Sequence, residues 1–263
     1  MSTPVDQTTD ATPEITVLGV RVHMVEMPQV VQRFEDWIQH RERCHYVVAT
    51  GMHGVMEAQR SPGFKSILNE ADLFVADGMS LVFVSRLRGV GLRKRVSGAD
   101  LMKEFISTSE EKGYKHFFYG DTDETLGELV KKLEQEFPDL VVAGVYSPPF
   151  RELSQEEDQE QVNIINESGA DVVWVGLGLP KQERWMFEHK DRLNAPVLVG
   201  VGAAFKFVSG QQTRAPQWMG DRGFEWAWRF IHEPRRVWRR VLIDGPRFAF
   251  HIALEQTGLR KYT

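Results

Sequence analysis

The chain has little of what secreted or membrane-spanning proteins contain. Cys44 is the only cysteine among 263 residues, so no internal disulfide can form, which fits a reducing compartment. No apolar run approaches the roughly 20 residues that a membrane-spanning helix needs. The first fourteen residues are polar and lack the basic-then-apolar pattern of a secretory signal. We therefore expect residues 1–14 to be a disordered N-terminus and the protein to be cytoplasmic.

The net charge of −5 is unevenly distributed along the chain. Residues 214–263 carry ten Lys and Arg against five Asp and Glu, a net charge of +5, whereas residues 1–213 have a net charge of −10. Four of the seven tryptophans also lie after residue 213. A basic, tryptophan-rich segment favours an anionic partner. The acidic body argues against a nucleic acid as that partner.

Short apolar runs alternate with amphipathic segments between residues 15 and 213. After an extended stretch over 15–25, the runs with the length and composition of buried parallel strands are 45–50, 73–76, 115–119, 140–146, 171–177 and 197–201. Helical patterns separate them. This alternation predicts a doubly wound, mostly parallel, Rossmann-like α/β sheet with helices on both faces. Residues 15–213 would form this catalytic domain, and residues 214–263 a helical appendage rich in Arg and Trp.

Asp77 stands where a buried strand is expected to end. The apolar run over 73–76 stops just before it, and a helical pattern over 79–87 follows. The carboxylate would then lie on the rim of the sheet, where open α/β sheets bind ligands, beside a helix N-terminus. Basic residues follow, among them Arg95, and lead to Gly98. A carboxylate facing a cationic loop indicates a general base opposite an anionic leaving group, with a plain helix cap as the alternative.

Two other strand ends carry polar side chains. Thr50 and His53 follow the run over 45–50, and their hydroxyl and imidazole can bind a sugar or assist proton transfer; His53 can equally begin a helix and face solvent. Asp121 and Asp123 have the spacing of metal-binding carboxylates in many nucleotide-sugar transferases. A helix begins there, however, and an N-cap explains the pair. We therefore expect no metal ion and no other cofactor.

A glycine-rich turn follows the strand expected over 171–177. Gly176 and Gly178 allow backbone amides to approach a phosphate, and Lys181 and Gln182 lie in the first turn of the next helix. The turn is a candidate nucleotide-phosphate site. It is not a dinucleotide fingerprint, because the third glycine would fall at Lys181. No such fingerprint occurs earlier in the chain, which argues against a dehydrogenase.

The basic segment after residue 213 is expected to be helical, with Pro234 dividing two helices. In the second helix, arginines cluster at i, i+4 spacing opposite Val237, Val241 and Leu242. Such a helix can lie on an anionic bilayer and bind phosphates through its guanidinium groups. An arginine-rich solvated face packed on the acidic body is the alternative. The candidate contacts to an acceptor diphosphate or a membrane are Arg214, Arg229, Arg235, Arg236, Arg239 and Arg240.

Several motifs occur in one order along the chain. They are Ala71-Asp72-(x4)-Asp77-Gly78, Arg95-Val96-x-Gly98-x-Asp100, Val175-Gly176-Leu177-Gly178-x-Pro180-Lys181-Gln182-Glu183, Arg214-Ala215-Pro216-x-Trp218, Glu225-Trp226-x-x-Arg229 and Glu233-Pro234-x-Arg236. Together, from about residue 16 to residue 240, they resemble the bacterial WecG/TagA/CpsF family of glycosyltransferases. The resemblance implies an inverting, metal-independent enzyme of teichoic-acid, capsule or exopolysaccharide synthesis. It would move a sugar from a UDP-sugar, such as UDP-N-acetylmannosamine, its uronate or UDP-glucose, to a polyprenyl-diphosphate-linked sugar.

The resemblance also implies roles for individual residues. Asp77 matches the family's catalytic base, and its active-site pocket would contain Thr50, Arg95 and Gln182. The arginines of the appendage match a segment that closes over the acceptor's diphosphate, with the enzyme peripherally bound at the inner face of the cytoplasmic membrane. Two departures bear on the sugar rather than on the reaction: Met52 replaces a common Asn, and Lys206 stands where an acidic residue is expected.

Some questions stay open at this stage. A nucleotide-binding α/β enzyme of another class and a nucleic-acid-binding module that uses the basic segment remain alternatives. The sequence names neither the two sugars nor the polymer. It also leaves open whether the protein forms a homo-oligomer.

Overall fold

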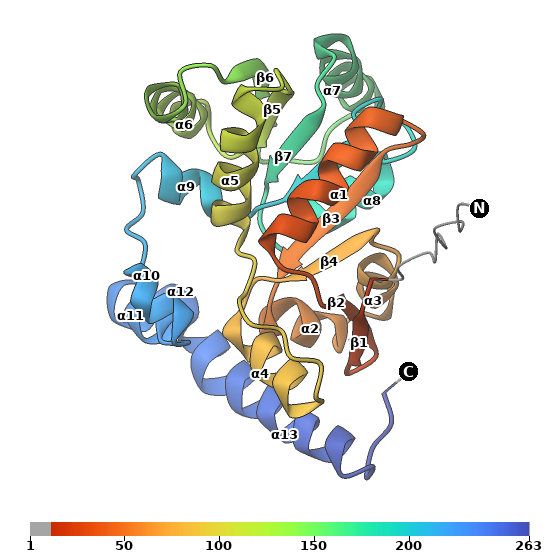
Figure 1. Ribbon diagram of the computed structural model, residues 1–263, viewed down its shortest axis with the longest axis vertical. Helices are drawn as coiled ribbons and strands as arrows, with labels where there is room; N and C mark the ends of the chain where they lie inside the picture. The colour runs from red at the N-terminus through yellow and green to blue at the C-terminus, as the bar shows by residue number, and fades with distance from the viewer. Residues whose placement is uncertain (1–11, 263) are drawn as a thin grey trace, which may run out of the picture.

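A single sheet of eight strands runs through the computed structural model, which describes residues 12–262 apart from the side chains of Asp221 and Arg236. The strand order is β1-β2-β4-β3-β8-β7-β5-β6, and every neighbouring pair except β1 with β2 is parallel (Figure 1). The strands are β1 (Glu14–Val17), β2 (Val20–His23), β3 (His45–Thr50), β4 (Leu73–Ala76), β5 (Lys115–Gly120), β6 (Val141–Tyr146), β7 (Val172–Gly176) and β8 (Val197–Gly200). The predicted mostly parallel α/β fold is confirmed. Most of the predicted disordered N-terminus, residues 1–11, lies outside the described residues.

The stretch over 15–25, expected to be simply extended, is a β-hairpin. β1 and β2 pair antiparallel, with Val17 opposite Val20. The two turn residues, Leu18 and Gly19, have φ angles of 50° and 77°, the left-handed backbone that two-residue hairpin turns require. Leu18 is fully buried, so its packing offsets the cost of this backbone for a residue with a Cβ. The sequence did not predict this turn because only one of its two residues is glycine.

Helices cover both faces of the sheet, because side chains along each strand alternate between two hydrophobic cores. In β3, Val47 and Ala49 face one core, and Tyr46 and Val48 face the other. The helices on the first core are α1 (Met27–His40), α5 (Gly98–Glu110), α6 (Asp123–Glu136) and α9 (Ala204–Val208). Those on the second core are α2 (Met52–Ala58), α3 (Pro62–Asn69), α4 (Met79–Leu87), α7 (Gln155–Ser168) and α8 (Lys181–His189).

The chain after residue 213 forms α10 (Gln217–Asp221), α11 (Glu225–His232), α12 (Pro234–Arg239), a π-helical turn η1 (Arg240–Asp244) and α13 (Gly245–Gln256). Pro234 divides two helices, as predicted. α13 packs against α2 and adds Phe248 and Ile252 to the second core. Glu255 of α13 accepts a hydrogen bond from the backbone N of Leu18 at 3.1 Å and pairs with Arg88. The last helix is therefore packed into the body, whereas α10–α12 form a group at its side.

Candidate active site

Asp77 lies on the rim of the sheet, directly after β4. Its backbone N donates to the carbonyl O of Thr50 at 3.1 Å, and β3 pairs with β4 so that Thr50 stands opposite Ala76. The residues that follow them, Gly51 and Gly78, also lie close together, because a Cβ on Gly51 would be 3.1 Å from the Cα of Gly78. The parallel pairing therefore fixes Thr50 and Asp77 side by side, as predicted from their strand ends.

The carboxylate of Asp77 does not cap a helix. The N-cap residue of α4 is Gly78, and this helix has no side-chain cap. The alternative reading of Asp77 as a helix cap is therefore wrong. The carboxylate remains available for other chemistry.

Burial raises the pKa of Asp77 to about 6. Arg95 and, more weakly, Arg214 lower the pKa of Asp77, whereas Glu225 and, more weakly, Asp100 raise it. A carboxylate with a pKa near 6 is ionised at neutral pH and is a stronger base than an ordinary aspartate. The electrostatics of the site therefore suit proton abstraction.

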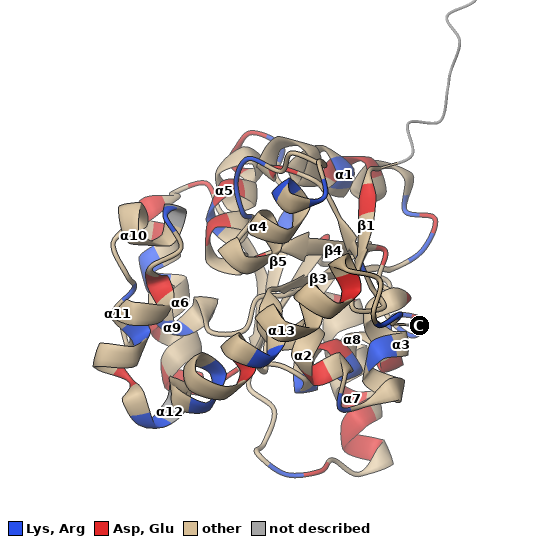
Figure 2. Cartoon of the chain, turned by 90° about the horizontal axis from the view of Figure 1, so that it is seen from below, with Lys and Arg blue, Asp and Glu red and all other residues tan. Residues whose placement is uncertain are grey.

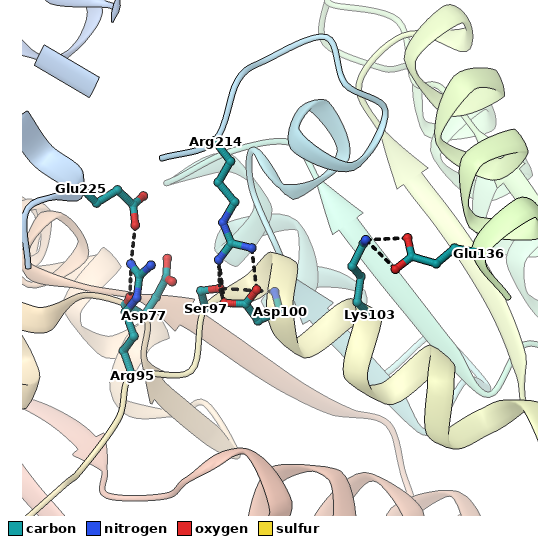
Figure 3. A network of polar contacts seen from close by, with 8 residues as sticks. All are labelled: Asp77, Arg95, Ser97, Asp100, Lys103, Glu136, Arg214 and Glu225. Carbon is teal, nitrogen blue, oxygen red and sulfur yellow. Dashed lines mark hydrogen bonds and ion pairs between the residues drawn. The ribbon is translucent and has the colours of Figure 1, made fainter. Parts of the chain in front are cut away.

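Arg95 lies next to Asp77, as the sequence predicted. Its Nη1 is 3.4 Å from the backbone O of Asp77 and 2.5 Å from Oε2 of Glu225 in α11 (Figure 3). The backbone N of Val96 donates to the O of Ala76 at 2.9 Å, which holds this loop against the end of β4. On the other side, a Cβ on Gly220 of α10 would lie 2.4 Å from Nη2 of Arg95. The guanidinium group is thus enclosed between the sheet rim and the appendage.

Arg214 forms a second contact between the appendage and the body. Its guanidinium group binds both carboxylate oxygens of Asp100 at 2.5 and 2.6 Å and lies 3.1 Å from Oγ of Ser97 (Figure 3). Ser97 is the N-cap of α5. Gly98 follows and packs against the end of β8, since a Cβ there would lie 3.1 Å from the Cα of Val201. In this structure Gly98 has a packing role, and Arg214 is engaged inside the protein.

Gln182 ties together the loops that follow β7 and β8. Its Oε1 accepts hydrogen bonds from the backbone N of Gly178 at 3.1 Å and of Gly202 at 2.9 Å. Gln182 is only 2% exposed. Lys181 beside it is exposed, and Gly176 is packed, since a Cβ there would lie 2.4 Å from the ring of Phe205. Of the glycine-rich turn, Gly178 and Lys181 are thus the residues open to a ligand, and Gln182 shapes the loop.

Glu183 is a residue whose importance the sequence analysis missed. It is fully buried, and its Oε1 accepts a hydrogen bond from Nε2 of Gln182 at 2.9 Å. Its Oε2 has no hydrogen-bond partner. Burial raises the pKa of Glu183 to about 7. The sequence did hold a signal: Glu183 directly follows Gln182 in the motif that begins α8.

His53 belongs to α2 and lies beside the appendage. Burial, and then the charge of Arg240 in η1, lower the pKa of His53 to about 4. Its Nδ1 is buried and has no hydrogen-bond partner. The imidazole is therefore neutral at physiological pH and half-buried rather than facing solvent. Its predicted contact with a sugar stays a prediction.

The Asp121-x-Asp123 pair begins a helix, as predicted. Thr122 is the N-cap of α6 and accepts a hydrogen bond from the backbone N of Thr125. Asp121 accepts from the hydroxyl of Thr125 at 3.1 Å and pairs with Lys206 at 3.6 Å. The unexpected basic residue at position 206 therefore has a partner in Asp121. Within residues 12–262, no cluster of three or more His, Cys, Asp or Glu is arranged to hold a metal ion.

The remaining arginines of the appendage occupy different environments. Arg229 lies over the ring of Phe207, with 6.0 Å from its Cζ to the ring centroid, whereas Arg235 and Arg239 are exposed. The side chain of Arg236 lies outside the described residues. Val237 is buried but Leu242 is 59% exposed, so the expected common apolar face is wrong. The π-helical turn over 240–244 changes the helical phase between them.

The rim of the sheet thus presents a poised carboxylate, a guanidinium group and an open glycine-rich turn, which is the arrangement of a group-transfer enzyme acting on an anionic substrate. Residues 15–262 match the profile of the family described as "Glycosyl transferase WecG/TagA/CpsF family". The chain belongs to this family and is a glycosyltransferase.

Curated relatives agree with this assignment. An N-acetylglucosaminyldiphosphoundecaprenol N-acetyl-beta-D-mannosaminyltransferase of Bacillus spizizenii is 30% identical over 217 residues, which is 82% of each chain. A protein of the same name from Staphylococcus aureus (strain MW2) is 26% identical over 251 residues, 95% of this chain and 96% of its own. The similarity to the second relative includes the appendage.

The pKa of Asp77 leads to a prediction about pH. A general base acts only when ionised, so kcat/KM should be level above about pH 7 and fall roughly tenfold per pH unit well below pH 6. Initial rates of sugar transfer between pH 4.5 and 8.5 measure this fall in kcat/KM. A midpoint near pH 4 would show that the general base is a carboxylate other than the buried Asp77.

The pKa of Glu183 leads to a prediction about stability. Because its folded-state pKa is raised, the folded state binds more protons than the unfolded state, and stability is lost as the pH rises from about 4.5 through about 7. Glu183→Gln removes this loss. The variant should gain about 2 kcal/mol in unfolding free energy relative to wild type between pH 5 and pH 8, measured by urea denaturation. Glu134→Gln, at an exposed position of α6, is the control and should show no such gain.

Proposed function

We propose that the protein transfers N-acetylmannosamine from UDP-N-acetylmannosamine to N-acetylglucosamine linked to undecaprenyl diphosphate. The single observation that carries the site assignment is Asp77, a carboxylate on the sheet rim with a pKa of about 6 beside Arg95. The choice of sugars is supported by the names of the relatives from Bacillus and Staphylococcus. UDP-glucose and the uronate of N-acetylmannosamine are the competing donors that a test must include.

The reaction would be a single displacement with inversion at the anomeric carbon. Asp77 takes the proton of the acceptor hydroxyl, whose oxygen forms the new bond to the anomeric carbon. The bond from that carbon to the donor's phosphate oxygen breaks, and its electron pair leaves with UDP. The negative charge that develops on UDP needs fixed positive groups. Arg95 and Lys181 are the cations of the rim, and the N-terminus of α8, where Lys181 lies, adds positive potential.

The appendage would hold the enzyme at the inner face of the cytoplasmic membrane. No helix within residues 12–262 is both long and apolar enough to cross a bilayer. Large exposed apolar side chains of the appendage before α13 are Trp218, Phe224, Trp226, Ile231, Trp238 and Leu242. The basic residues on α12 (Figure 2) are arginines, of which Arg235 and Arg239 are exposed. Aromatic groups that enter the interface, combined with arginines that attract anionic lipids, are typical of peripheral membrane binding.

The direct test is a panel of UDP-sugars with a short-chain lipid-diphosphate N-acetylglucosamine acceptor, in buffer that contains a chelator, with products read by mass spectrometry. The proposal expects a product from UDP-N-acetylmannosamine. A product from another donor alone would correct the sugar, and strict dependence on added Mg²⁺ or Mn²⁺ would contradict the metal-independent mechanism.

Asp77→Asn should abolish most transfer and leave the fold intact. Loss of a general base costs about 100- to 10,000-fold in rate, while Asn keeps the size of the side chain. Transfer is measured in the same assay, and calorimetry of UDP binding is the control that should change little. More than about a tenth of wild-type activity would remove Asp77 from the mechanism.

Exchanging Arg235 and Arg239 together for Ala should weaken binding to vesicles that contain phosphatidylglycerol. Each arginine near an anionic surface contributes about 1 kcal/mol, so the loss should be roughly 30-fold and should shrink as salt rises. Co-sedimentation measures it. Changing Lys112 and Lys115, exposed residues at the amino end of β5, removes the same charge far from the appendage. Equal losses in both double variants would contradict a membrane surface on α12.

A further inference from the structure

The carboxylate of Glu225 binds the guanidinium group of Arg95, which the diphosphate of the proposed donor would also use. Its Oε2 lies 2.5 Å from Nη1 of Arg95, although the two residues are 130 positions apart (Figure 3). Both side chains are largely buried, with exposed fractions of 12% for Arg95 and 24% for Glu225. A carboxylate thus sits where an anionic phosphate oxygen of a ligand could bind the same donor.

The charges around this contact disfavour a simultaneous diphosphate. Three carboxylates, those of Asp77, Asp100 and Glu225, act within the site against the guanidinium groups of Arg95 and Arg214. Arg214 is already bound by both oxygens of Asp100. A diphosphate would add negative charge to a site where carboxylates already outnumber arginines. Removing one carboxylate from Arg95 relieves this repulsion and frees a bidentate phosphate donor.

Glu225 belongs to an element that can move at low cost. None of the described residues of α11 is buried, so releasing this helix exposes little apolar core. Its contacts with the body include the ion pair with Arg95, the placement of Arg229 over Phe207 and the hydrogen bond from Gln212 to Glu233, the C-cap residue. α13, by contrast, is held by core residues. Weakly packed elements are the ones that open locally.

We propose that Glu225 is an internal substitute for the donor's diphosphate. Without donor, its carboxylate neutralises Arg95 and holds α11 beside Asp77. The incoming diphosphate takes Arg95, Glu225 leaves, and α10–α12 are released to meet the lipid-linked acceptor. Donor binding at the rim is thereby coupled to the exposed aromatic and basic surface of the appendage. This inference rests on the proposed use of a UDP-sugar at Arg95.

The first measurement is calorimetry of UDP binding to the full-length protein. Glu225→Gln keeps the shape and a hydrogen-bond acceptor but removes the competing charge, so it should bind UDP about three- to tenfold more tightly than wild type. Glu233→Gln is the matched control, since it removes the same charge from the end of α11 without touching Arg95. Its UDP affinity should equal that of wild type. An unchanged or weaker affinity in Glu225→Gln, or an equal gain in Glu233→Gln, would overturn the inference.

The second measurement is amide hydrogen exchange, made on the wild-type protein and on Glu225→Gln. UDP should speed exchange over residues 217–239 in the wild-type protein, and Glu225→Gln should show this faster exchange without UDP. If UDP instead slows exchange there, Glu225 does not leave and the inference fails while the proposed function stands. If wild-type protein binds no UDP at all, the proposed function fails, and the inference fails with it.

Discussion

The pairing of β3 with β4 is the constraint on which the site depends. Parallel hydrogen bonding carries Thr50 and Asp77 to the same rim, and the hydrogen bond from Asp77 to the carbonyl of Thr50 extends that pairing by one residue. The Arg95 loop is then held in place by the bond from Val96 to Ala76. Backbone bonds therefore position both Asp77 and the loop that carries Arg95. The Asp77 carboxylate is left available for chemistry, whereas the Arg95 guanidinium group is paired with Glu225.

Docking of the appendage onto the body reverses the charge pattern expected from composition. A basic segment on an acidic body would be held by its arginines, and Arg214 with Asp100 is such a pair. Three other contacts run the opposite way: carboxylates of the appendage bind arginines of the body, in the pairs Glu225–Arg95, Asp244–Arg60 and Glu255–Arg88. Using its few acidic residues for docking leaves Arg235 and Arg239 of α12 exposed. The residues that dock the appendage are thus separate from its exposed arginines on α12.

Asp77 and Glu183 are two acids that burial affects in the same direction. Asp77 and Glu183 both have raised pKa values because burial disfavours their charged forms. They differ in their surroundings. Arg95 lowers the pKa of Asp77 and opposes the effect of burial, whereas the groups that oppose burial at Glu183 are the Gln182 amide and its own backbone. The first arrangement suits proton abstraction, and the second fixes the orientation of Gln182 between two loops.

The sequence by itself determined the α/β class, the strand ends and the family, because strand length, helical periodicity and ordered motifs are local or linear properties. It also placed Thr50 and Asp77 on one rim, since carboxyl ends of parallel strands share it, and the family resemblance added Arg95 to their pocket. Tertiary structure decided what depends on partners distant in the chain. Examples are the pairing of Lys206 with Asp121, the contact of His53 with η1 and the hold of Glu225 on Arg95. Such contacts form only when segments up to about 190 residues apart are folded together, and no local pattern specifies them.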